Sequence, residues 1–237
     1  MLPSATAPAA EPAVHAPLSA AGIAALNTRY APLDFEARIH SLYQDFAVGD
    51  VLVTSSFAAT SAYFLHIVSR LRPDQRIAFI DTGYHFPETL AYRQYLTERF
   101  GLQVFDVRAE EWKHQFTLDD RTYQRDPDYC CAINKVEPLD AIKPRYRVWV
   151  SSVMGWQTDN RAGMAIFEER RGILKFNPMI DVTREQRDAY IREHDLPFHP
   201  LVAQGYSSIG CSHCTVSGDG RSGRWQGKPK TECGLHL

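Results

Sequence analysis

The sequence of 237 residues has no marked excess of either charge: 26 lysines and arginines stand against 28 aspartates and glutamates, and the formal net charge is −2. A domain that binds nucleic acid usually carries a strong basic excess over its surface. The chain also lacks a run of about 18 consecutive apolar residues, which a membrane-spanning helix requires. We therefore expect neither a nucleic-acid partner nor a membrane partner, and any basic patch should be local.

The first 20 residues have neither the basic start nor the apolar stretch of a secretory signal. They are rich in alanine and proline, which predicts a disordered tail over residues 1–20. We expect a cytoplasmic protein, and structural disulfides are uncommon in the cytoplasm. The sequence holds only five cysteines, and in such a chain they indicate metal binding or thiol chemistry.

Helix and strand patterns alternate along most of the chain. Residues 19–46 have apolar residues at helical spacing, interrupted at Pro32, which predicts one or two N-terminal helices. Further strands and helices are predicted at 50–56, 58–71, 76–80, 88–100, 102–107, 146–154 and 184–194. This alternation predicts an α/β fold with a doubly wound parallel sheet, in which ligands bind beyond the carboxyl ends of the strands.

Two loops follow predicted strands and therefore lie where a ligand is expected. The first, "TSSFAATS", places hydroxyl groups and backbone amides at a helix N-terminus, which suits an anion. It contains no glycine and is not a G-x-x-x-x-G-K-[ST] loop, so Ser55 or Ser56 acting simply as a helix N-cap is an alternative. In the second, "DTGYHFPET", Asp81 ends a strand and Gly83 permits a tight turn, although a plain loop before a helix has the same composition.

Four of the cysteines form two pairs, Cys130 with Cys131 and Cys211 with Cys214. Four thiolates suit a structural zinc ion or an iron–sulfur cluster. Adjacent cysteines are awkward for zinc, whose usual knuckle is C-x-x-C. A disulfide or redox role for Cys211 and Cys214 is an alternative, and His213 between them is interpreted as a spacer.

The fifth cysteine, Cys233, stands four residues from the C-terminus. Cationic neighbours favour the thiolate form of a cysteine, and basic residues surround this one in sequence: Arg221, Arg224, Lys228, Lys230 and His236. We expect an exposed nucleophile, whose attack on an anionic substrate needs cations to offset the repulsion. An incidental thiol among solvated charges is the alternative.

Taken together, these motifs resemble the assimilatory sulfonucleotide reductases, which comprise the adenylyl-sulfate and phosphoadenylyl-sulfate reductases. The resemblance begins near Leu26 and rests on "TSSFAATSAYFLHIV", "DTGYHFPET", "CCAINKVEPL", "KFNP", "HPLVAQGYSSIGCSHC" and "GRSGRWQGKPKTECGLHL". It implies a sheet of the adenine nucleotide alpha-hydrolase-like, or PP-loop, type. Residues 21–210 would form the sulfonucleotide-binding domain, and residues 211–237 a flexible tail that ligates a cluster and carries the nucleophile.

The resemblance also implies a reaction. Cys233 would attack the sulfur of adenosine 5'-phosphosulfate, expel AMP and become S-sulfocysteine, from which thioredoxin or glutaredoxin releases sulfite. The four other cysteines mark the branch of the family that carries a 4Fe-4S cluster and generally uses the substrate without a 3'-phosphate.

Substrate-binding residues are implied in the same way. Ser55 and Ser56 would contact the anionic end of the substrate, and the turn from Asp81 to Gly83 would lie against adenosine. Lys135 would bridge cluster and substrate. The remaining binding residues implied by the resemblance lie in the tail and would grip phosphate and sulfate or complete the site: Arg221, Arg224 and His236.

The sequence departs from the family pattern at two places. Met154-Gly155-Trp156-Gln157-Thr158 stands where R-R-x-Q-S is usual, and Asn134 stands where a basic residue often precedes the lysine. Reduction of the 3'-phosphorylated nucleotide is one alternative. Others are a zinc module without activity and a tRNA-thiolating protein, although the latter usually has S-G-G-x-D-S at the first loop.

Overall fold

A computed structural model describes residues 18–228 and 230–236. Most of the tail predicted over residues 1–20 therefore lies outside the described residues. Ser19, within that tail, caps the first helix by accepting a hydrogen bond from the backbone amide of Gly22. In the part of the chain that is described, no helix has the length and apolarity needed to cross a membrane.

One six-stranded sheet runs through the molecule, with the strand order β3-β2-β1-β4-β6-β5. Its strands are β1 (Val51–Ser55), β2 (Arg76–Ile80), β3 (Gln103–Val107), β4 (Val148–Val150), β5 (Phe167–Arg170) and β6 (Ile173–Phe176). Every pair is parallel except β5 with β6. The α/β class is confirmed, with an antiparallel edge strand added to the predicted parallel sheet.

The edge strand arises from a tight turn between β5 and β6. Arg171 and Gly172, which connect the strands, both have positive φ angles, of 53° and 78°. Two consecutive residues of this kind form the hairpin turn whose twist matches antiparallel strands. The short strands on either side show no strong alternation of apolar and polar residues. The sequence patterns alone therefore did not predict this hairpin.

Helices α1 (Ala20–Tyr30) and α2 (Phe35–Asp45) confirm the predicted N-terminal pair, broken around Pro32. The other α-helices are α3 (Ser61–Leu71), α4 (Pro87–Phe100), α5 (Glu111–Asp119), α6 (Thr122–Arg125), α7 (Pro127–Cys131), α8 (Glu137–Ile142), α9 (Asp159–Ala162) and α10 (Arg184–Glu193). Short turns of other helix types are η1 (Val48–Asp50), η2 (Ala132–Val136), η3 (Lys143–Arg145), η4 (Gly155–Gln157), η5 (Pro200–Gln204) and η6 (Ser212–Cys214).

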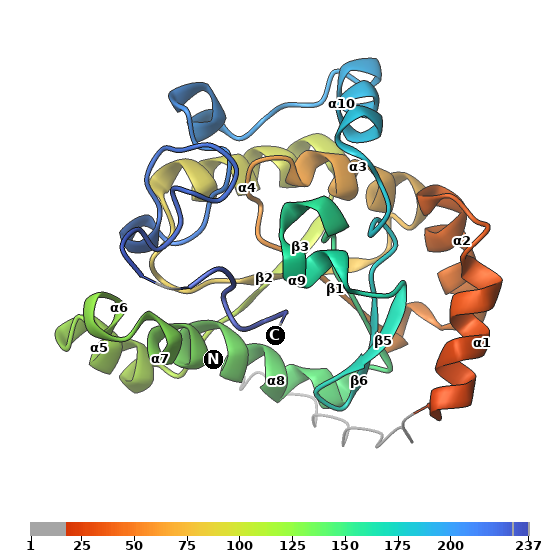
Figure 1. The fold of residues 1–237 in the computed structure, drawn as a ribbon, viewed down its shortest axis with the longest axis horizontal. Coiled ribbons are helices and arrows are strands. Elements are labelled where there is room, and N and C mark those ends of the chain that lie inside the picture. The colour runs from red at the N-terminus through yellow and green to blue at the C-terminus, as the bar shows by residue number, and fades with distance from the viewer. Residues whose placement is uncertain (1–17, 229, 237) are drawn as a thin grey trace, which may run out of the picture.

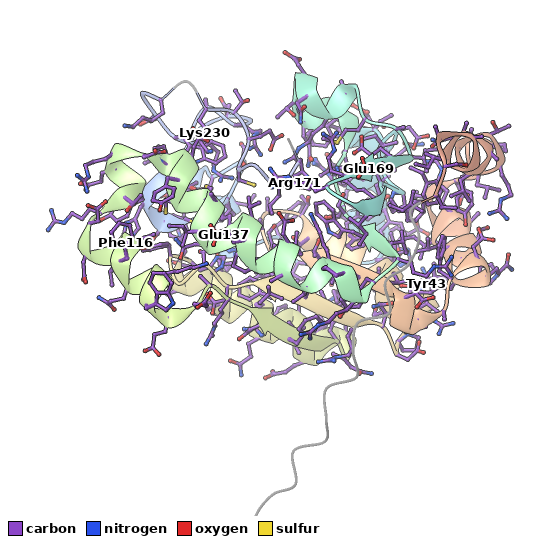
Figure 2. The ribbon with its side chains drawn as sticks, turned by 90° about the horizontal axis from the view of Figure 1, so that it is seen from below. Tyr43, Phe116, Glu137, Glu169, Arg171 and Lys230 are labelled. Atoms are coloured by element: carbon purple, nitrogen blue, oxygen red, sulfur yellow. The ribbon has the colours of Figure 1, made fainter. Side chains whose placement is uncertain are left out.

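Successive side chains of the central strands enter two different cores. Val51 and Val53 of β1 belong to the larger core, whereas Leu52 between them packs with Trp149 of β4 in the smaller one. This alternation follows from the two-residue period of a strand. In Figure 1 helices α3 and α4 cover one face of the sheet and α8 covers the other. Figure 2 looks from below onto α8, whose first residue is the labelled Glu137.

Arg38 joins the N-terminal helices to the chain that follows the last strand. Its side chain is almost completely buried and forms two hydrogen bonds to Asp181, of 2.6 and 2.7 Å. It also donates to the backbone carbonyls of Tyr30 and Pro178. A further hydrogen bond goes to the carbonyl of Ala31, so removing Arg38 would leave three carbonyl groups without this partner, which is costly in a buried place.

We therefore expect Arg38→Leu to lower the free energy of unfolding by about 3 kcal/mol, since a buried charged hydrogen-bond network is lost. Arg72→Ala is the matched control, because Arg72 pairs with the exposed Asp74 at the surface and such pairs contribute about 0.5 kcal/mol. Urea denaturation measures both. Equal losses in the two variants would contradict this role for Arg38.

Candidate active site

A large pocket opens at the carboxyl ends of β1 and β4. Strands β2 and β3 lie to one side of β1, and β4 lies on the other, so the chain changes direction between β1 and β4. Such a switch point is where open α/β sheets bind ligands. The loops after both strands line the pocket, together with residues of the C-terminal tail.

The loop after β1 places Ser55 and Ser56 in the lining of this pocket. Ser55 is the last residue of the strand, and its hydroxyl accepts a hydrogen bond from the amide of Phe57. The residue at the N-cap of α3 is Thr60, so the alternative that Ser55 or Ser56 caps this helix is wrong. The Thr60 side chain makes no capping hydrogen bond; the Ser61 and Tyr63 amides instead donate to the carbonyls of Ala58 and Thr60.

The structure does not bring Asp81 and Gly83 to the pocket, although both were predicted to contact adenosine. The Asp81 carboxylate pairs with Arg108 at 2.6 Å and accepts a hydrogen bond from the Gly83 amide. Gly83 has a φ of 71°, and a Cβ atom there would lie 2.4 Å from the ring of His114. These residues shape the turn, while Ile80 and His85 of the same segment line the pocket.

The described residues of the tail pack against the domain. Trp225 and Glu232 are buried, and Cys233, predicted to be exposed, is only partly so. Cys233 lines the large pocket together with Lys135 of η2. The predicted nucleophile therefore faces the same space as the loop after β1, from which it is separated by about three quarters of the sequence.

Lys135 and Cys233 shift each other's proton affinity. Burial alone raises the pKa of Cys233, but the charge of Lys135, the Leu235 amide and Arg224 together bring it below its ordinary value. Burial likewise lowers the pKa of Lys135, and the thiols of Cys211, Cys131 and Cys233 more than compensate, so it lies above its ordinary value. The two groups thus favour a thiolate beside an ammonium ion, which is the reactive form of cysteine.

Arg224 is held at the pocket by packing more than by hydrogen bonds. Its guanidinium carbon lies 4.3 Å from the centroid of the Trp225 ring, and Nη1 is 3.4 Å from the Ser208 hydroxyl. Its buried Nε has no hydrogen-bond partner among the described residues. A Cβ atom at Gly210 would lie 2.2 Å from Nη2 of Arg224. A side chain at position 210 would therefore displace this guanidinium from its present place.

His236 also lines the pocket, with its ring stacked on Trp149 at a centroid distance of 5.6 Å. Burial, followed by the charges of Arg161 and Lys175, holds its pKa well below the ordinary value. His236 is therefore a neutral imidazole that can donate or accept a hydrogen bond. Its buried Nδ1 has no partner in the part of the chain that is described, so this atom is free to contact a ligand.

The tail is fastened by the buried carboxylate of Glu232. It accepts hydrogen bonds of 2.7 and 2.9 Å from Arg161 and one of 2.9 Å from the Thr158 hydroxyl. Arg221, whose pKa burial lowers to about 10, lies 3.4 Å from the same carboxylate and donates to the backbone of Thr231. Two of the arginines at the pocket thus share one acid, and that acid is the neighbour of Cys233.

Several pocket residues were not predicted from the sequence. Besides Arg161 they include Trp149, Trp156, Gln157, Arg184 and Arg187. Arg184 and Arg187 belong to a predicted helix, but their positions one turn apart are equally typical of a solvated helix face. Only the placement of α10 next to η4 brings them to the pocket.

All four paired cysteines line a second, smaller cavity, and Lys135 lines both cavities. Burial raises the pKa of Cys130 to about 12 and that of Cys214 to about 11, with the neighbouring thiols adding to the effect. Hydrogen-bonding side chains surround the sulfurs: the Thr82 hydroxyl lies 3.3 Å from Sγ of Cys211, and Nδ2 of Asn134 lies 3.7 Å from Sγ of Cys130.

Within residues 18–228 and 230–236, no three histidine, cysteine or acidic side chains converge in a way that could hold a single metal ion. In a 4Fe-4S cluster each of four cysteines binds a different iron, so its ligands surround a cavity rather than one point. Four soft thiol donors around one cavity fit that requirement. Burial raises the pKa of Cys130, Cys131 and Cys214, so an added cation would favour their thiolate forms.

Residues 50–217 match the family described as "Phosphoadenosine phosphosulfate reductase domain". The chain belongs to this family. It is 41% identical over 200 residues to the phosphoadenosine 5'-phosphosulfate reductase of Gloeobacter violaceus, covering 79% of this chain and 83% of the relative. It is 38% identical over 225 residues to the adenosine 5'-phosphosulfate reductase of Mesorhizobium japonicum, covering 92% and 87%.

Solved structures agree with this assignment. The phosphoadenylyl-sulfate reductase of Candida auris, in a phosphate complex, superimposes with a TM-score of 0.70 at 26% identity, over 84% of this chain and 98% of that one. An FMN adenylyltransferase of Candida glabrata superimposes with a TM-score of 0.55 at 11% identity, over 86% and 70%. At that identity the second likeness concerns the fold alone. The predicted PP-loop type of fold is confirmed.

We expect Glu232→Gln to loosen the tail, because Arg161 loses its buried acid. Burial raises the pKa of Glu232, but Arg161 and Arg221 bring it below the ordinary 4.5. Its contribution to tail docking is therefore complete above about pH 4.5 and is lost as the pH falls through the lowered pKa. Hydrogen exchange of residues 225–236 measures this. In wild type their protection should fall on acidification, and in the variant it should be low at every pH.

The exposed Glu185 of α10 provides the control. Glu185→Gln should leave exchange in the tail unchanged. Full protection of residues 225–236 in Glu232→Gln at neutral pH would contradict the proposed fastening.

Proposed function

We propose that this protein reduces adenosine 5'-phosphosulfate to sulfite and AMP in assimilatory sulfate reduction, through a covalent intermediate on Cys233. The observation that carries the proposal is the position of the Cys233 thiol, beside Lys135 and Arg224, in a pocket at the switch point of the sheet. Membership of the family supports it, as do relatives named adenosine 5'-phosphosulfate reductase at 36–38% identity.

The first step is displacement at sulfur. The Cys233 thiolate forms a bond to the sulfur of the sulfate group, the bond from that sulfur to the bridging oxygen breaks, and AMP leaves with the electron pair. A thiolate that approaches an anionic substrate is repelled by it. Lys135 and Arg224 offset this repulsion, since neither pairs with a carboxylate in the described part of the chain.

The second step needs an external dithiol, for which we propose thioredoxin or glutaredoxin. One of its thiolates attacks Sγ of the modified Cys233 and displaces sulfite, and its second thiol then resolves the mixed disulfide. The dithiol is oxidised and the sulfur of the sulfate group is reduced, so the electrons balance. Because Cys233 is only partly exposed, the tail must undock before the protein reductant can reach it. A cytoplasmic location agrees with such a partner.

We also propose that Cys130, Cys131, Cys211 and Cys214 hold a 4Fe-4S cluster. A bound cluster with four thiolates supplies a fixed charge next to Lys135, which lines its cavity. Asn134 donates toward the sulfur of Cys130, and the Thr82 hydroxyl lies within hydrogen-bond distance of the sulfur of Cys211. Hydrogen bonds of this kind orient metal ligands and tune the metal site.

The nucleotide with a 3'-phosphate is a second candidate substrate. The Gloeobacter violaceus relative, at 41% identity, is named for that nucleotide, and arginines line the pocket at more than one place. A tRNA-thiolating function receives no such support, because the loop after β1 lacks glycine and the family match is to the reductases.

The covalent step predicts a trapped adduct. Without reductant, adenosine 5'-phosphosulfate should modify the enzyme once and release one equivalent of AMP. Mass spectrometry should then find an added SO3 group on the peptide that contains Cys233, and thioredoxin should remove it. Cys233→Ser should bind nucleotide and release no sulfite. An adduct on Cys211 or Cys214, or sulfite production by Cys233→Ser near the wild-type rate, would falsify the mechanism.

The cluster predicts a chromophore. Protein purified without oxygen should absorb near 400 nm, as expected for thiolate-to-iron charge transfer, and should contain about four irons and four sulfides per chain. Cys130→Ser and Cys211→Ser should lose the colour, since serine is a poor ligand for such a cluster. Cys233→Ser is the matched control and should keep it. One zinc per chain in place of iron would contradict the assignment.

A further inference from the structure

The cavity of the four paired cysteines reaches the molecular surface on one side. Most of the residues that line it are buried, but Tyr123, Cys214 and Lys135 are only partly buried and His213 is exposed. Lys135 also lines the large pocket, so its exposed part belongs to that side. The side of the cavity that borders on bulk solvent is therefore formed by Tyr123, His213 and Cys214.

Two aromatic rings are stacked on this side. Tyr123 of α6 and His213 of η6 have ring centroids 3.9 Å apart and ring planes inclined by only 12°. Tyr84, which is buried in the wall of the cavity, packs edge-on against His213 at 5.1 Å and lies 5.8 Å from the Tyr123 ring. Rings at such distances are in van der Waals contact, which leaves no space for water between them.

The stack joins the two segments that carry the cysteine pairs. Tyr123 lies on α6, directly before the helix with the first pair, and His213 stands between the two cysteines of the second pair. The elements α6 and η6 are in contact. The stack therefore bridges the boundary between these segments on the solvent side, where a small solute would otherwise enter.

His213 is not needed as a metal ligand. A 4Fe-4S cluster takes four cysteines, and all four line the cavity. A metal-binding histidine is normally held at its second nitrogen by a hydrogen bond, and no residue in the described part of the chain supplies such a bond to His213. Its exposed ring, stacked face to face on Tyr123, suits a cover over the cavity.

We propose that the stacked rings of Tyr123 and His213 close the cysteine cavity to solvent and thereby protect the cluster from small solutes. The apolar shell around a metal site controls the access of solvent to it. Dioxygen that reaches a cluster takes an electron from it and becomes superoxide, and the oxidised cluster then releases iron to a chelator. His213, interpreted from the sequence as a spacer, is in this view half of the cover. The inference rests on the proposed function for the presence of the cluster.

The rate at which the holoenzyme loses its chromophore tests the inference. Purified without oxygen, every variant should contain the wild-type amount of iron, since the four cysteines are unchanged. In air-saturated buffer with EDTA, His213→Ala and Tyr123→Ala should lose the absorbance near 400 nm at least about fivefold faster than wild type, because each opens the stack. The double variant should be within about twofold of the faster single variant, since one missing ring already removes the contact.

Variants that keep the ring are the matched controls. His213→Phe and Tyr123→Phe should bleach at the wild-type rate. So should Tyr129→Ala, because Tyr129 is 50% exposed and precedes Cys130 but does not line the cavity.

Wild-type bleaching rates in both single alanine variants would overturn the inference. Loss of iron from anaerobically purified His213→Phe would do so as well, because His213 would then be a ligand. Faster bleaching of the alanine variants in a protein that releases no sulfite would support the cover and refute only the reaction. Absence of a cluster from the wild type would refute the cluster assignment and this inference together.

Discussion

The hydrogen bonds between Glu232 and Arg161 determine where Cys233 lies. The thiol belongs to a segment whose described residues form no strand or α-helix, and side-chain hydrogen bonds fasten that segment at the pocket. Glu232 is the next residue and is fully buried, so burying its charge is acceptable only while both oxygens are paired. Arg161 lies on α9, just beyond β4. These hydrogen bonds therefore fix the position of Cys233 relative to β4, a central strand of the sheet.

In the proposed mechanism, the same fastening creates a conflict between attack by Cys233 and release of sulfite. A docked tail holds Cys233 against the substrate and beside Lys135, which favours attack. Release of sulfite by a protein thiol needs access to the same sulfur atom, which is only partly exposed here. Glu232, shared by Arg161 and Arg221, is a suitable contact for a tail that docks and undocks. The strength of these ion pairs depends on the charges nearby, so a change of charge in the pocket can weaken them. In the proposed mechanism the pocket loses an anion when AMP leaves, and the balance between the docked and the undocked tail can then change.

Much of the fold follows from short-range patterns, and much of the site does not. The buried strands β1 and β2, and helices such as α4, are recognisable from apolar runs and their flanking residues. The β5–β6 hairpin depends on two consecutive positive φ angles. One of them belongs to Arg171, and an arginine does not predict a positive φ angle. Ser55, Lys135 and Cys233 were predicted as site residues from their motifs, and all three line the pocket. Asp81 and Gly83 looked equally suitable, but the turn directs them toward Arg108 and His114.

Arg184 and Arg187 illustrate why the cations at the pocket were the hardest residues to predict. A cation can reach a pocket from any element that ends near it, so the sequence around the nucleophile does not reveal it. The segment from Met154 to Thr158 lacks the arginine pair expected there, yet its Trp156 packs against two arginines that lie about 30 residues further along the chain. Positive charge therefore stands beside this segment in space, although it is absent from it in sequence.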